Sequence, residues 1–373
     1  MEWCGTPLAT RKLIVNRTTP EAVGRSQMAP ARSLVTGGSG FIGRQLVSAL
    51  LCRGDIVRVL DSTAPFEPLP GVEFVQGSIL DGATVGRALN GVDRVFHLAA
   101  IPHLWTPDVN DFDAVNRRGT ETLLAAAAAA PVRRFVHCST EAVLMLPRVT
   151  PVIDEAAPSS LDDMAGPYTR SKYLAEQAAI AAARAGFPVV IVNPTLPIGR
   201  GDRRLTPPTA LMALYLLRRS RFFLDCVLNL VDVRDVAAGM LLAAEHGRPG
   251  ERYILGGENM RLREVATLLG RMRGRETRMW SVPGSLALAS GHLCQWTSDY
   301  ITHRMPTVTA EGVRLALRSA PIDNAKARRE LGYAPRPVLD AITSAASWIL
   351  SALPANSSAP VEQGVAHTRA TGP

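Results

Sequence analysis

Tyr168 and Lys172 stand four residues apart in the segment PYTRSKYLAEQ, residues 167–177. The chain has 41 lysines and arginines, yet its lysines are only Lys12, Lys172 and Lys326. Residues i and i+4 share one face of a helix. A phenol with a pKa near 10 is too weak a base at neutral pH, and a neighbouring ammonium favours its ionised form. The pair therefore predicts a general acid/base, Tyr168, whose pKa Lys172 lowers. A planar guanidinium would substitute poorly for this compact cation.

A glycine-rich turn precedes this pair in the chain. The segment TGGSGFIG places Gly37, Gly40 and Gly43 between a short apolar strand that starts at Arg32 and a stretch of helical periodicity. Such glycines allow a tight turn and let a pyrophosphate approach the N-terminus of the helix, where free N–H groups favour an anion. A purely structural turn is the alternative. The spacing predicts a dinucleotide site.

Asp61 ends the second predicted strand, 24 residues beyond Gly37. A carboxylate at this place can accept both ribose hydroxyls of the adenosine and repels a 2′-phosphate. It predicts that NAD(H) is favoured over NADP(H). A carboxylate that only caps the following turn is the alternative.

Thr140 ends the predicted fifth strand in the segment FVHCST. Its hydroxyl could hold a substrate oxygen beside the Tyr168 phenol while hydride moves. Ser139 could take this role instead, and a hydroxyl that only caps the strand end is the third interpretation.

Strands alternate with helices through the first half of the chain, which indicates a parallel sheet covered on both faces. We expect an α/β fold with a Rossmann-type doubly wound parallel sheet, and ligands at the carboxyl ends of its strands. After the strand that starts at Arg32, the predicted strands are 55–61, 72–77, 92–100, 132–140 and 187–195, and the predicted helices are 83–89, 111–130 and 168–185.

The alternation weakens after Pro194, which predicts a smaller, mostly helical C-terminal substrate lobe. We expect the NAD-binding domain at 30–195 plus about 228–257, and the substrate lobe at 196–227 plus 258–352. Residues 1–29 lack periodicity. We expect them either to be disordered or to be a leader wrongly added to the reading frame, in which case translation naturally starts at Met28. The tail, 353–373, is poor in apolar residues and is expected to be disordered.

Composition excludes several classes of protein. The net charge is +8, but the arginines are scattered and never form a dense run with aromatic residues, so nucleic acid is not an expected partner. No apolar run approaches the roughly 20 residues of a membrane span. The five cysteines have neither metal-site nor disulfide-framework spacing, which favours a cytoplasmic location and no metal.

Taken together, these motifs resemble the extended short-chain dehydrogenase/reductase superfamily over residues 32–350. The resemblance rests on the glycine turn, the hydroxyl residue after strand five, the Tyr168/Lys172 pair and the segment VDVRDVA, 231–237. The segments HLAAIPHLWTPD, NPTLPIG and AKARRELGYAPRP look most like the hopanoid-associated sugar epimerase group. That group borders the dihydroflavonol reductases and the 3β-hydroxysteroid dehydrogenases.

The resemblance implies a set of functional residues. The implied catalytic residues are Thr140, Tyr168, Lys172 and Asn116, the last in a proton relay or as a positioning residue. The implied cofactor-binding residues are Gly37, Gly40, Phe41, Ile42, Gly43, Asp61, Leu98, Ala99, Ala100, Tyr168, Lys172 and Pro194.

The chain departs from the family pattern at two places. Ser78 follows Gly77 where the family commonly has an aspartate that meets the adenine amine, and Glu141 follows Thr140 in place of a small residue. Glu141 is expected either in solvent or against the substrate. His97 and His103 flank the end of the fourth strand, and we expect them to be packed or solvated side chains and not catalytic.

Three functions fit these residues. The favoured one is an NAD(H)-dependent oxidoreductase that interconverts a secondary alcohol and a ketone on an apolar small molecule, either polycyclic, steroid-like or prenylated. The alternative is an NAD-dependent sugar or nucleotide-sugar epimerase. The segment VNPTLPIG argues against it, because such enzymes usually have an FN pattern at that place. A non-catalytic NAD sensor has no need of the Tyr168/Lys172 pair. The resemblance also implies a homodimer paired through the helix of Tyr168.

Overall fold

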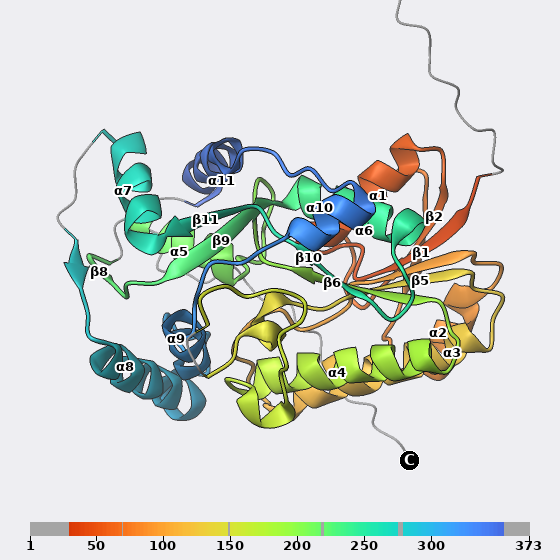
Figure 1. The fold of residues 1–373 in the computed structure, drawn as a ribbon, viewed down its shortest axis with the longest axis horizontal. Coiled ribbons are helices and arrows are strands. Elements are labelled where there is room, and N and C mark those ends of the chain that lie inside the picture. The colour runs from red at the N-terminus through yellow and green to blue at the C-terminus, as the bar shows by residue number, and fades with distance from the viewer. Residues whose placement is uncertain (1–29, 69, 148–149, 218–219, 275–278, 354–373) are drawn as a thin grey trace, which may run out of the picture.

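A seven-stranded parallel sheet forms the centre of the protein (Figure 1). The computed structural model describes residues 30–68, 70–147, 150–217, 220–274 and 279–353, so the predictions for residues 1–29 and 354–373 lie outside the described residues. The strand order is β10-β6-β5-β4-β1-β2-β3. The strands are β1 (Arg32–Thr36), β2 (Ile56–Asp61), β3 (Val72–Gln76), β4 (Arg94–His97), β5 (Arg134–Cys138), β6 (Val189–Pro194) and β10 (Arg252–Leu255).

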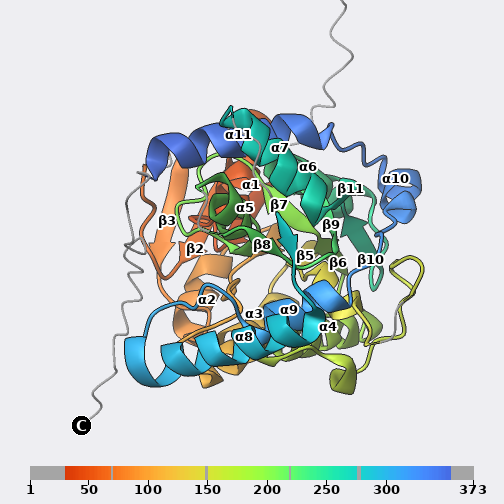
Figure 2. The same cartoon turned by 90° about the vertical axis from the view of Figure 1, so that its left-hand side faces the viewer.

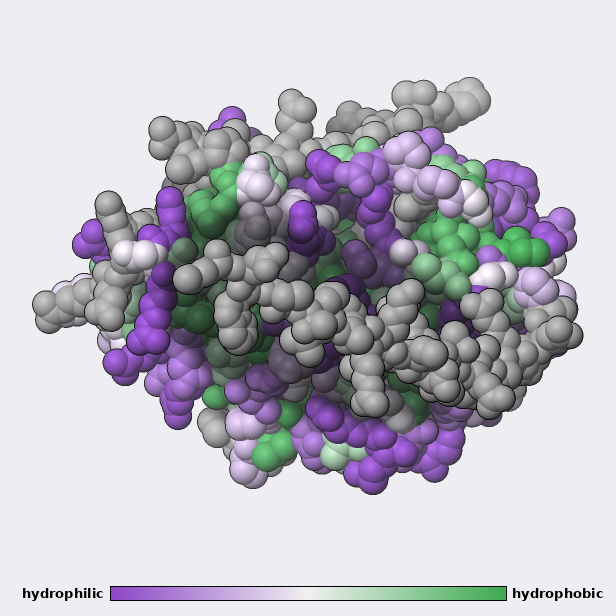
Figure 3. Space-filling view, turned by 90° about the horizontal axis from the view of Figure 1, so that it is seen from above, coloured by the Kyte–Doolittle hydropathy of each residue, from purple (hydrophilic) through white to green (hydrophobic). Residues whose placement is uncertain are grey.

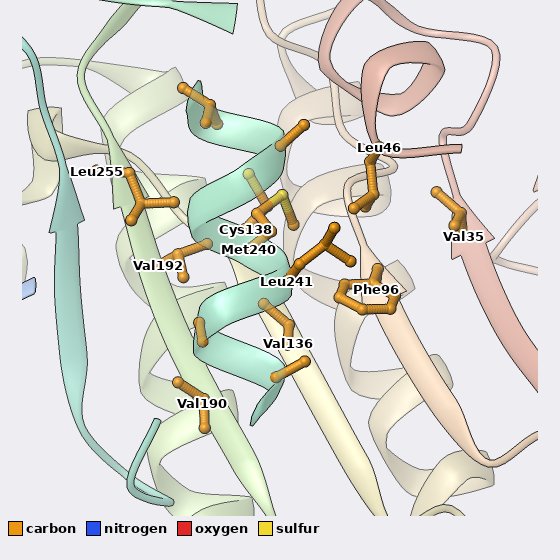
Figure 4. Close-up of a cluster of buried hydrophobic side chains, with 14 of the residues drawn as sticks. Val35, Leu46, Phe96, Val136, Cys138, Val190, Val192, Met240, Leu241 and Leu255 are labelled. Atoms are coloured by element: carbon orange, nitrogen blue, oxygen red, sulfur yellow. The ribbon is translucent and has the colours of Figure 1, made fainter. Parts of the chain in front are cut away.

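Helices cover both faces of this sheet, as Figure 1 shows. One layer holds α1 (Phe41–Cys52) and α6 (Val233–His246), and the other holds α2 (Gly82–Leu89), α3 (Gly119–Ala128) and α4 (Pro167–Arg184). Successive residues of a strand point to opposite faces of the sheet. Because helices cover both faces, the side chains on both faces must be apolar. Figure 4 shows Met240 and Leu241 of α6 lying over Val136 of β5 within one such core. The prediction of a Rossmann-type doubly wound sheet is confirmed.

The strand order reverses at β1, which lies between β2 and β4. Ligands bind at such a switch point, outside the carboxyl ends of the strands. The strands that meet there end at Thr36, Asp61 and His97.

The predicted helix 111–130 is two segments. A π-helical segment, η1 (Phe112–Arg118), leads directly into α3. Single π turns within helices are frequent at functional sites. Periodicity at 3.6 residues does not separate this wider turn from an α-helix, so the sequence did not predict it.

The C-terminal region is mostly helical, as expected, and lies beside the carboxyl ends of the central strands (Figures 1 and 2). It also contains two small sheets that the sequence did not predict, ordered β11-β9-β7 and β12-β8. The helices are α5 (Pro207–Leu216), α7 (Leu262–Met272), α8 (Gly284–Thr297), α9 (Ala310–Leu317), α10 (Ala325–Leu331) and α11 (Val338–Ala352), with the π-helical η4 (Ser298–Thr302). The strands are β7 (Leu196–Ile198), β8 (Phe222–Phe223), β9 (Val227–Asp232), β11 (Glu258–Arg261) and β12 (Trp280–Ser281). Two short 3₁₀ helices, η2 (Glu141–Leu144) and η3 (Leu161–Asp163), precede α4.

The surface is mixed in character. On the face seen in Figure 3, hydrophilic residues are interspersed with apolar patches. Several large apolar side chains of α8 and η4 are exposed, among them Leu293 and Trp296. No helix among the described residues is both long and apolar enough to cross a membrane.

Candidate active site

The glycine turn joins β1 to α1 beside the end of β4. Gly37 has a φ of +70°, and a Cβ atom there would lie 2.8 Å from the backbone nitrogen of Ala99. A Cβ atom at Gly43 would overlap the carbonyl oxygen of Gly37. α1 begins at Phe41 and Ile42, and no described side chain caps its N-terminus at Gly40. The first amide groups of α1 therefore fit a phosphate group.

Asp61 holds this turn from the end of β2. Its Oδ2 accepts a hydrogen bond from the amide of Ser39 at 3.0 Å, and its Oδ1 accepts one from the amide of Thr63 at 3.0 Å. Each carboxylate oxygen has a second lone pair. Asp61 thus caps local backbone, as one interpretation of the sequence proposed, and keeps acceptor capacity toward the crevice.

A cavity of about 100 Å³ lies over the glycine turn, where Ser39, Gly40 and Phe41 line it. The side chains of Arg44 and Arg203 meet there on the carboxylate of Glu67, at 3.1 and 2.6 Å. The hydrogen bond from Arg203 and the charge of Arg44 hold the pKa of Glu67 below its usual value. The sequence did not predict either arginine, although Arg44 directly follows the third glycine of the motif. Glu67 offsets one of the two positive charges, and the other adds to the helix N-terminus in favouring an anion.

The remaining predicted cofactor residues lie at the ends of neighbouring strands. The amide of Leu98 donates to the Thr36 carbonyl oxygen at 3.1 Å, and that of Ala99 donates to the Thr36 hydroxyl at 3.3 Å. These bonds hold Leu98 to Ala100, which are partly buried, against the glycine turn. Pro194 is buried at the end of β6. The predicted set thus shares one edge of the sheet.

Three of the four predicted catalytic residues, Thr140, Tyr168 and Lys172, lie near the end of β5. The Nζ atom of Lys172 is buried and donates to the carbonyl oxygen of Cys138 at 2.7 Å. Thr140 lies two residues beyond Cys138, close enough to Tyr168 to lower the pKa of its phenol. Ser139, the alternative to Thr140, is buried, and its hydroxyl has no partner among the described residues. The geometry favours Thr140 as the hydroxyl that shares a substrate oxygen with Tyr168.

The pKa of Tyr168 is raised, which contradicts the prediction that Lys172 lowers it. Burial of the phenol is the largest cause and the charge of Glu141 the next, and the hydrogen bond with Thr140 acts in the opposite direction. The Lys172 ammonium contacts a carbonyl oxygen, and burial lowers its own pKa. Tyr168 is therefore a protonated phenol at neutral pH in this structure, the form that donates a proton.

Glu141 lies inside the site and not in solvent. Its side chain is 5% exposed, and its Oε2 accepts a hydrogen bond from the Thr140 hydroxyl at 3.0 Å. Burial raises its pKa from 4.5 to about 7, while the Thr140 hydrogen bond lowers it. A carboxyl group that changes charge near neutral pH thus touches the hydroxyl that would hold the substrate.

Asn116 lies in η1 and bridges two segments of the site. Its Oδ1 accepts from the amide of Ile101 at 2.8 Å, and its Nδ2 donates to the hydroxyl of Ser171 at 2.9 Å. Ser171 donates in turn to the carbonyl oxygen of Tyr168 at 2.7 Å. These contacts describe a positioning residue that fixes α4 relative to the end of β4.

The two histidines at the end of β4 differ. The ring nitrogens of His97 lie 2.8 Å from the hydroxyls of Thr36 and Thr120, and burial lowers its pKa to about 3. His97 is a packed neutral side chain, as expected. His103 is partly buried, and burial together with the charge of Arg204 lowers its pKa to about 4.

A buried network that the sequence did not predict supports the strand end. Glu176 forms an ion pair with Nε of Arg252 at 2.7 Å and accepts from Nδ2 of Asn193 at 2.8 Å. The same Asn193 nitrogen donates to the carbonyl oxygen of Thr140 at 3.0 Å. Glu176 follows Lys172 by four residues, so helical spacing could have placed it on the inner face of α4.

The fold and this site together define a nicotinamide-dependent enzyme of the extended short-chain dehydrogenase/reductase class. The model of the NAD dependent epimerase/dehydratase family matches residues 33–256, and the chain belongs to that family. It is 35% identical to the "Putative dihydroflavonol 4-reductase" of Synechocystis sp. over 84% of this chain and 93% of the relative.

Two further similarities bear on chemistry. The 4-hydroxy-2-methyl-3-oxo-4-farnesyl-3,4-dihydroquinoline-1-oxide ketoreductase of Stigmatella aurantiaca is 36% identical over 87% of this chain and 99% of its own. Among solved structures, the dTDP-glucose 4,6-dehydratase DesIV of Streptomyces venezuelae, with NAD bound, superposes with a TM-score of 0.69. It is 28% identical and covers 86% of this chain and 97% of its own.

Proposed function

We propose that the protein is an NAD(H)-dependent oxidoreductase that interconverts a secondary alcohol and a ketone on an apolar, polycyclic, steroid-like or prenylated small molecule. The observation that carries the proposal is the convergence of Thr140, Tyr168 and Lys172 on the end of β5, beside the glycine turn. A hydroxyl, a phenol and an ammonium at this edge form the machinery of a carbonyl reductase.

The mechanism follows from the protonation state of the phenol. The nicotinamide, when bound, supplies or accepts the hydride. Thr140 and Tyr168 hold the substrate oxygen, and Tyr168 delivers its proton to that oxygen as a ketone is reduced. Its proton is present at neutral pH, as in an ordinary phenol, and the raised pKa keeps it there, so Tyr168 can serve as the donor for ketone reduction. Lys172 donates to the carbonyl oxygen of Cys138, which holds its ammonium at the strand end and adds positive charge to the site.

The class of substrate rests on the relatives and on the lobe beside the site. The Stigmatella relative is named as a ketoreductase of a farnesylated dihydroquinoline, an apolar bicyclic ketone. In this chain, α8 and η4 expose Leu286, Leu293 and Tyr300. An apolar lobe next to a proton donor fits an apolar ketone better than a sugar.

The cofactor preference rests on Asp61. Its carboxylate is buried and fixed beside the glycine turn by the amides of Ser39 and Thr63. A fixed negative charge at this place accepts ribose hydroxyls and repels a 2′-phosphate. We therefore infer a preference for NAD(H) over NADP(H).

A nucleotide-sugar epimerase is the second candidate, and a specific observation favours it. Arg203 and Arg204 line the cavity over the glycine turn, and the charge of Arg204 reaches His103 at the end of β4. The cavity itself fits the cofactor in either reaction, so only Arg204, whose charge reaches the end of β4, would suit the diphosphate of a nucleotide sugar. The DesIV structure shows that the same fold can act on a dTDP-sugar.

One experiment separates the two candidates. The protein is incubated with apolar ketones and NADH and, separately, with nucleotide sugars and NAD⁺, because an epimerase must first take a hydride from the sugar. Cofactor absorbance and product chirality are followed in both. Net NADH consumption with a ketone supports the oxidoreductase. Epimerised sugar without net consumption overturns it in favour of the epimerase. The Tyr168→Phe variant is run in parallel, since either activity must require the phenol.

A further inference from the structure

We propose that Glu311 of α9 is a positioning residue that anchors the start of the Tyr168 helix to the C-terminal region. This inference rests on the proposed role of Tyr168. Glu311 lies 143 residues beyond Tyr168 in sequence, and its side chain is 3% exposed. Figures 1 and 2 both show α9 beside the end of α4 at which Tyr168 lies.

The Glu311 carboxylate binds the first amide groups of α4. Its Oε1 accepts from the amide of Thr169 at 2.8 Å and from the Thr169 hydroxyl at 2.8 Å. Its Oε2 accepts from the amide of Tyr168 at 3.2 Å. A helix leaves its first amides without intrahelical partners, and a carboxylate there also complements the helix dipole. Glu311 therefore caps α4 from a distant helix and bonds the backbone of the proposed proton donor.

The residue before the helix is suited to this approach. α4 begins at Pro167, and its N-cap is Gly166. A Cβ atom at Gly166 would lie 2.5 Å from Oε2 of Glu311, so any larger residue would push the carboxylate away. Glycine lacks the side-chain oxygen with which Ser, Thr or Asp usually caps a helix. Glu311 supplies that oxygen from α9.

Two arginines of the same segment hold the chain just before α4. Nη1 of Arg314 donates to the carbonyl oxygen of Ala165 at 3.1 Å, and Nη1 of Arg318 donates to that of Asp163. On its other side, α9 approaches the loop after β4, since a Cβ atom at Gly312 would lie 3.1 Å from Leu104. The position of Tyr168 is thus tied to the region that we expect to hold the substrate.

The charge of Glu311 also acts on the phenol. Around Tyr168 stand the titratable groups Glu141, Glu311 and Cys138, and each of them raises its pKa. Removal of the Glu311 charge should therefore lower the pKa of the phenol. A role in folding alone would not predict this shift.

The test compares Glu311→Gln with Glu258→Gln in the full chain. Glu258 is a matched control because its Oε1 accepts from the amide of Val338, the first residue of α11, at 3.0 Å. It caps another helix from a distance, and that helix carries no proposed catalytic residue. The measurements are kcat, the Kd for NADH by fluorescence, the thermal midpoint, and the titration of the Tyr168 phenol by ¹³C NMR of labelled tyrosine, assigned with Tyr168→Phe.

We expect Glu311→Gln to lower kcat at least ~10-fold, because misplaced catalytic groups lose rate steeply, while the Kd for NADH stays within about twofold. The phenol should titrate at lower pH, so the alkaline limb of the pH profile for reduction should move down as well. Glu258→Gln should lower the thermal midpoint and leave kcat and the phenol titration unchanged.

The outcomes separate the two proposals. If Tyr168→Phe is inactive but Glu311→Gln keeps both kcat and the phenol titration of the wild type, the positioning role is wrong and the proposed function stands. If Tyr168→Phe keeps its turnover, the proposed function is wrong, whereas a phenol shift in Glu311→Gln still supports the anchor. If Glu311→Gln does not fold, Glu311→Asp is measured instead. Its shorter carboxylate keeps the charge, so kcat should fall while the pKa of Tyr168 stays at its wild-type value. A wild-type kcat in Glu311→Asp would overturn the proposal.

Discussion

The two halves of the site are built in opposite ways. The cofactor half is centred on one turn, Gly37–Gly43, whose backbone groups make the binding surface, with the Asp61 side chain and the backbone of Leu98 and Ala99 against it. The catalytic half, Thr140, Tyr168 and Lys172, is assembled from side chains of separate elements. The cofactor half therefore depends on the shape of one turn, and the catalytic half depends on packing across the whole molecule.

The contacts of the catalytic half show how far that dependence reaches. Asn116 donates a hydrogen bond to Ser171, 55 residues away in the sequence, and Asn193 donates one to the Thr140 carbonyl oxygen, 53 residues away. Glu311 accepts one from the amide of Tyr168, 143 residues away. Substitutions there should change rate and protonation, whereas substitutions in the cofactor half should change NADH affinity.

Tyr168→Phe should have the largest effect. Turnover should fall at least ~10²-fold, the lower end for loss of a general acid/base group, while the Kd for NADH stays near that of the wild type. Tyr173→Phe is the matched control on the same helix, because the Tyr173 hydroxyl donates only to the carbonyl oxygen of Ser159 at 3.3 Å, away from the site. Turnover and fluorescence titration measure both variants. Equal turnover in the two would remove Tyr168 from the mechanism.

Glu141→Gln should change how stability depends on pH. The pKa of Glu141 is raised by burial from 4.5 to about 7, so between these values the folded protein binds more protons than the unfolded chain. Stability should therefore fall as pH rises through this range, by up to about 3 kcal/mol at roughly 1.4 kcal/mol per pKa unit. The Gln variant should lack this fall.

Urea denaturation at pH 5 and pH 8 measures the effect. Glu121→Gln, at an exposed position of α3, is the control and should follow the wild-type pH dependence. If Glu141→Gln and the wild type lose the same stability between the two pH values, the Glu141 carboxyl does not titrate in the folded protein as described.

The same division explains what could be predicted from the sequence. The order of strands and helices and the glycine turn are local patterns, and the structure has them where they were expected. The raised pKa of Tyr168 was not predictable, because it depends first on burial of the phenol and then on the charges of Glu141 and Glu311, and folding alone creates those surroundings. The π-helical turn at Asn116 was missed for a related reason, since its partners Ile101 and Ser171 lie on other segments.

Gly43→Ala tests the cofactor half. The added Cβ would overlap the Gly37 carbonyl oxygen, so the turn must shift. Overpacking of this kind costs about 1–3 kcal/mol, and we expect weaker NADH binding together with a lower thermal midpoint. Gly86→Ala is the matched control in α2, where an added Cβ meets nothing within 4 Å. Alanine should stabilise that helix by about 0.5–1 kcal/mol. Identical effects of both variants would mean that Gly43 is not needed for close packing.

Asp61→Asn should have the smallest effect and concerns affinity alone. The amide keeps the size of the side chain but only one acceptor, so the backbone amide of either Ser39 or Thr63 loses its partner. The negative charge is lost as well. Selectivity for NADH over NADPH should fall by about tenfold, equivalent to about 1.4 kcal/mol, and kcat with saturating NADH should change little. Asp81→Asn is the control, because Asp81 caps α2 through the amide of Ala83 in the same manner. Unchanged discrimination in Asp61→Asn would refute its ribose-binding role and leave it as a structural cap. A large fall in kcat would instead show that the two halves of the site are coupled more tightly than their separate construction implies.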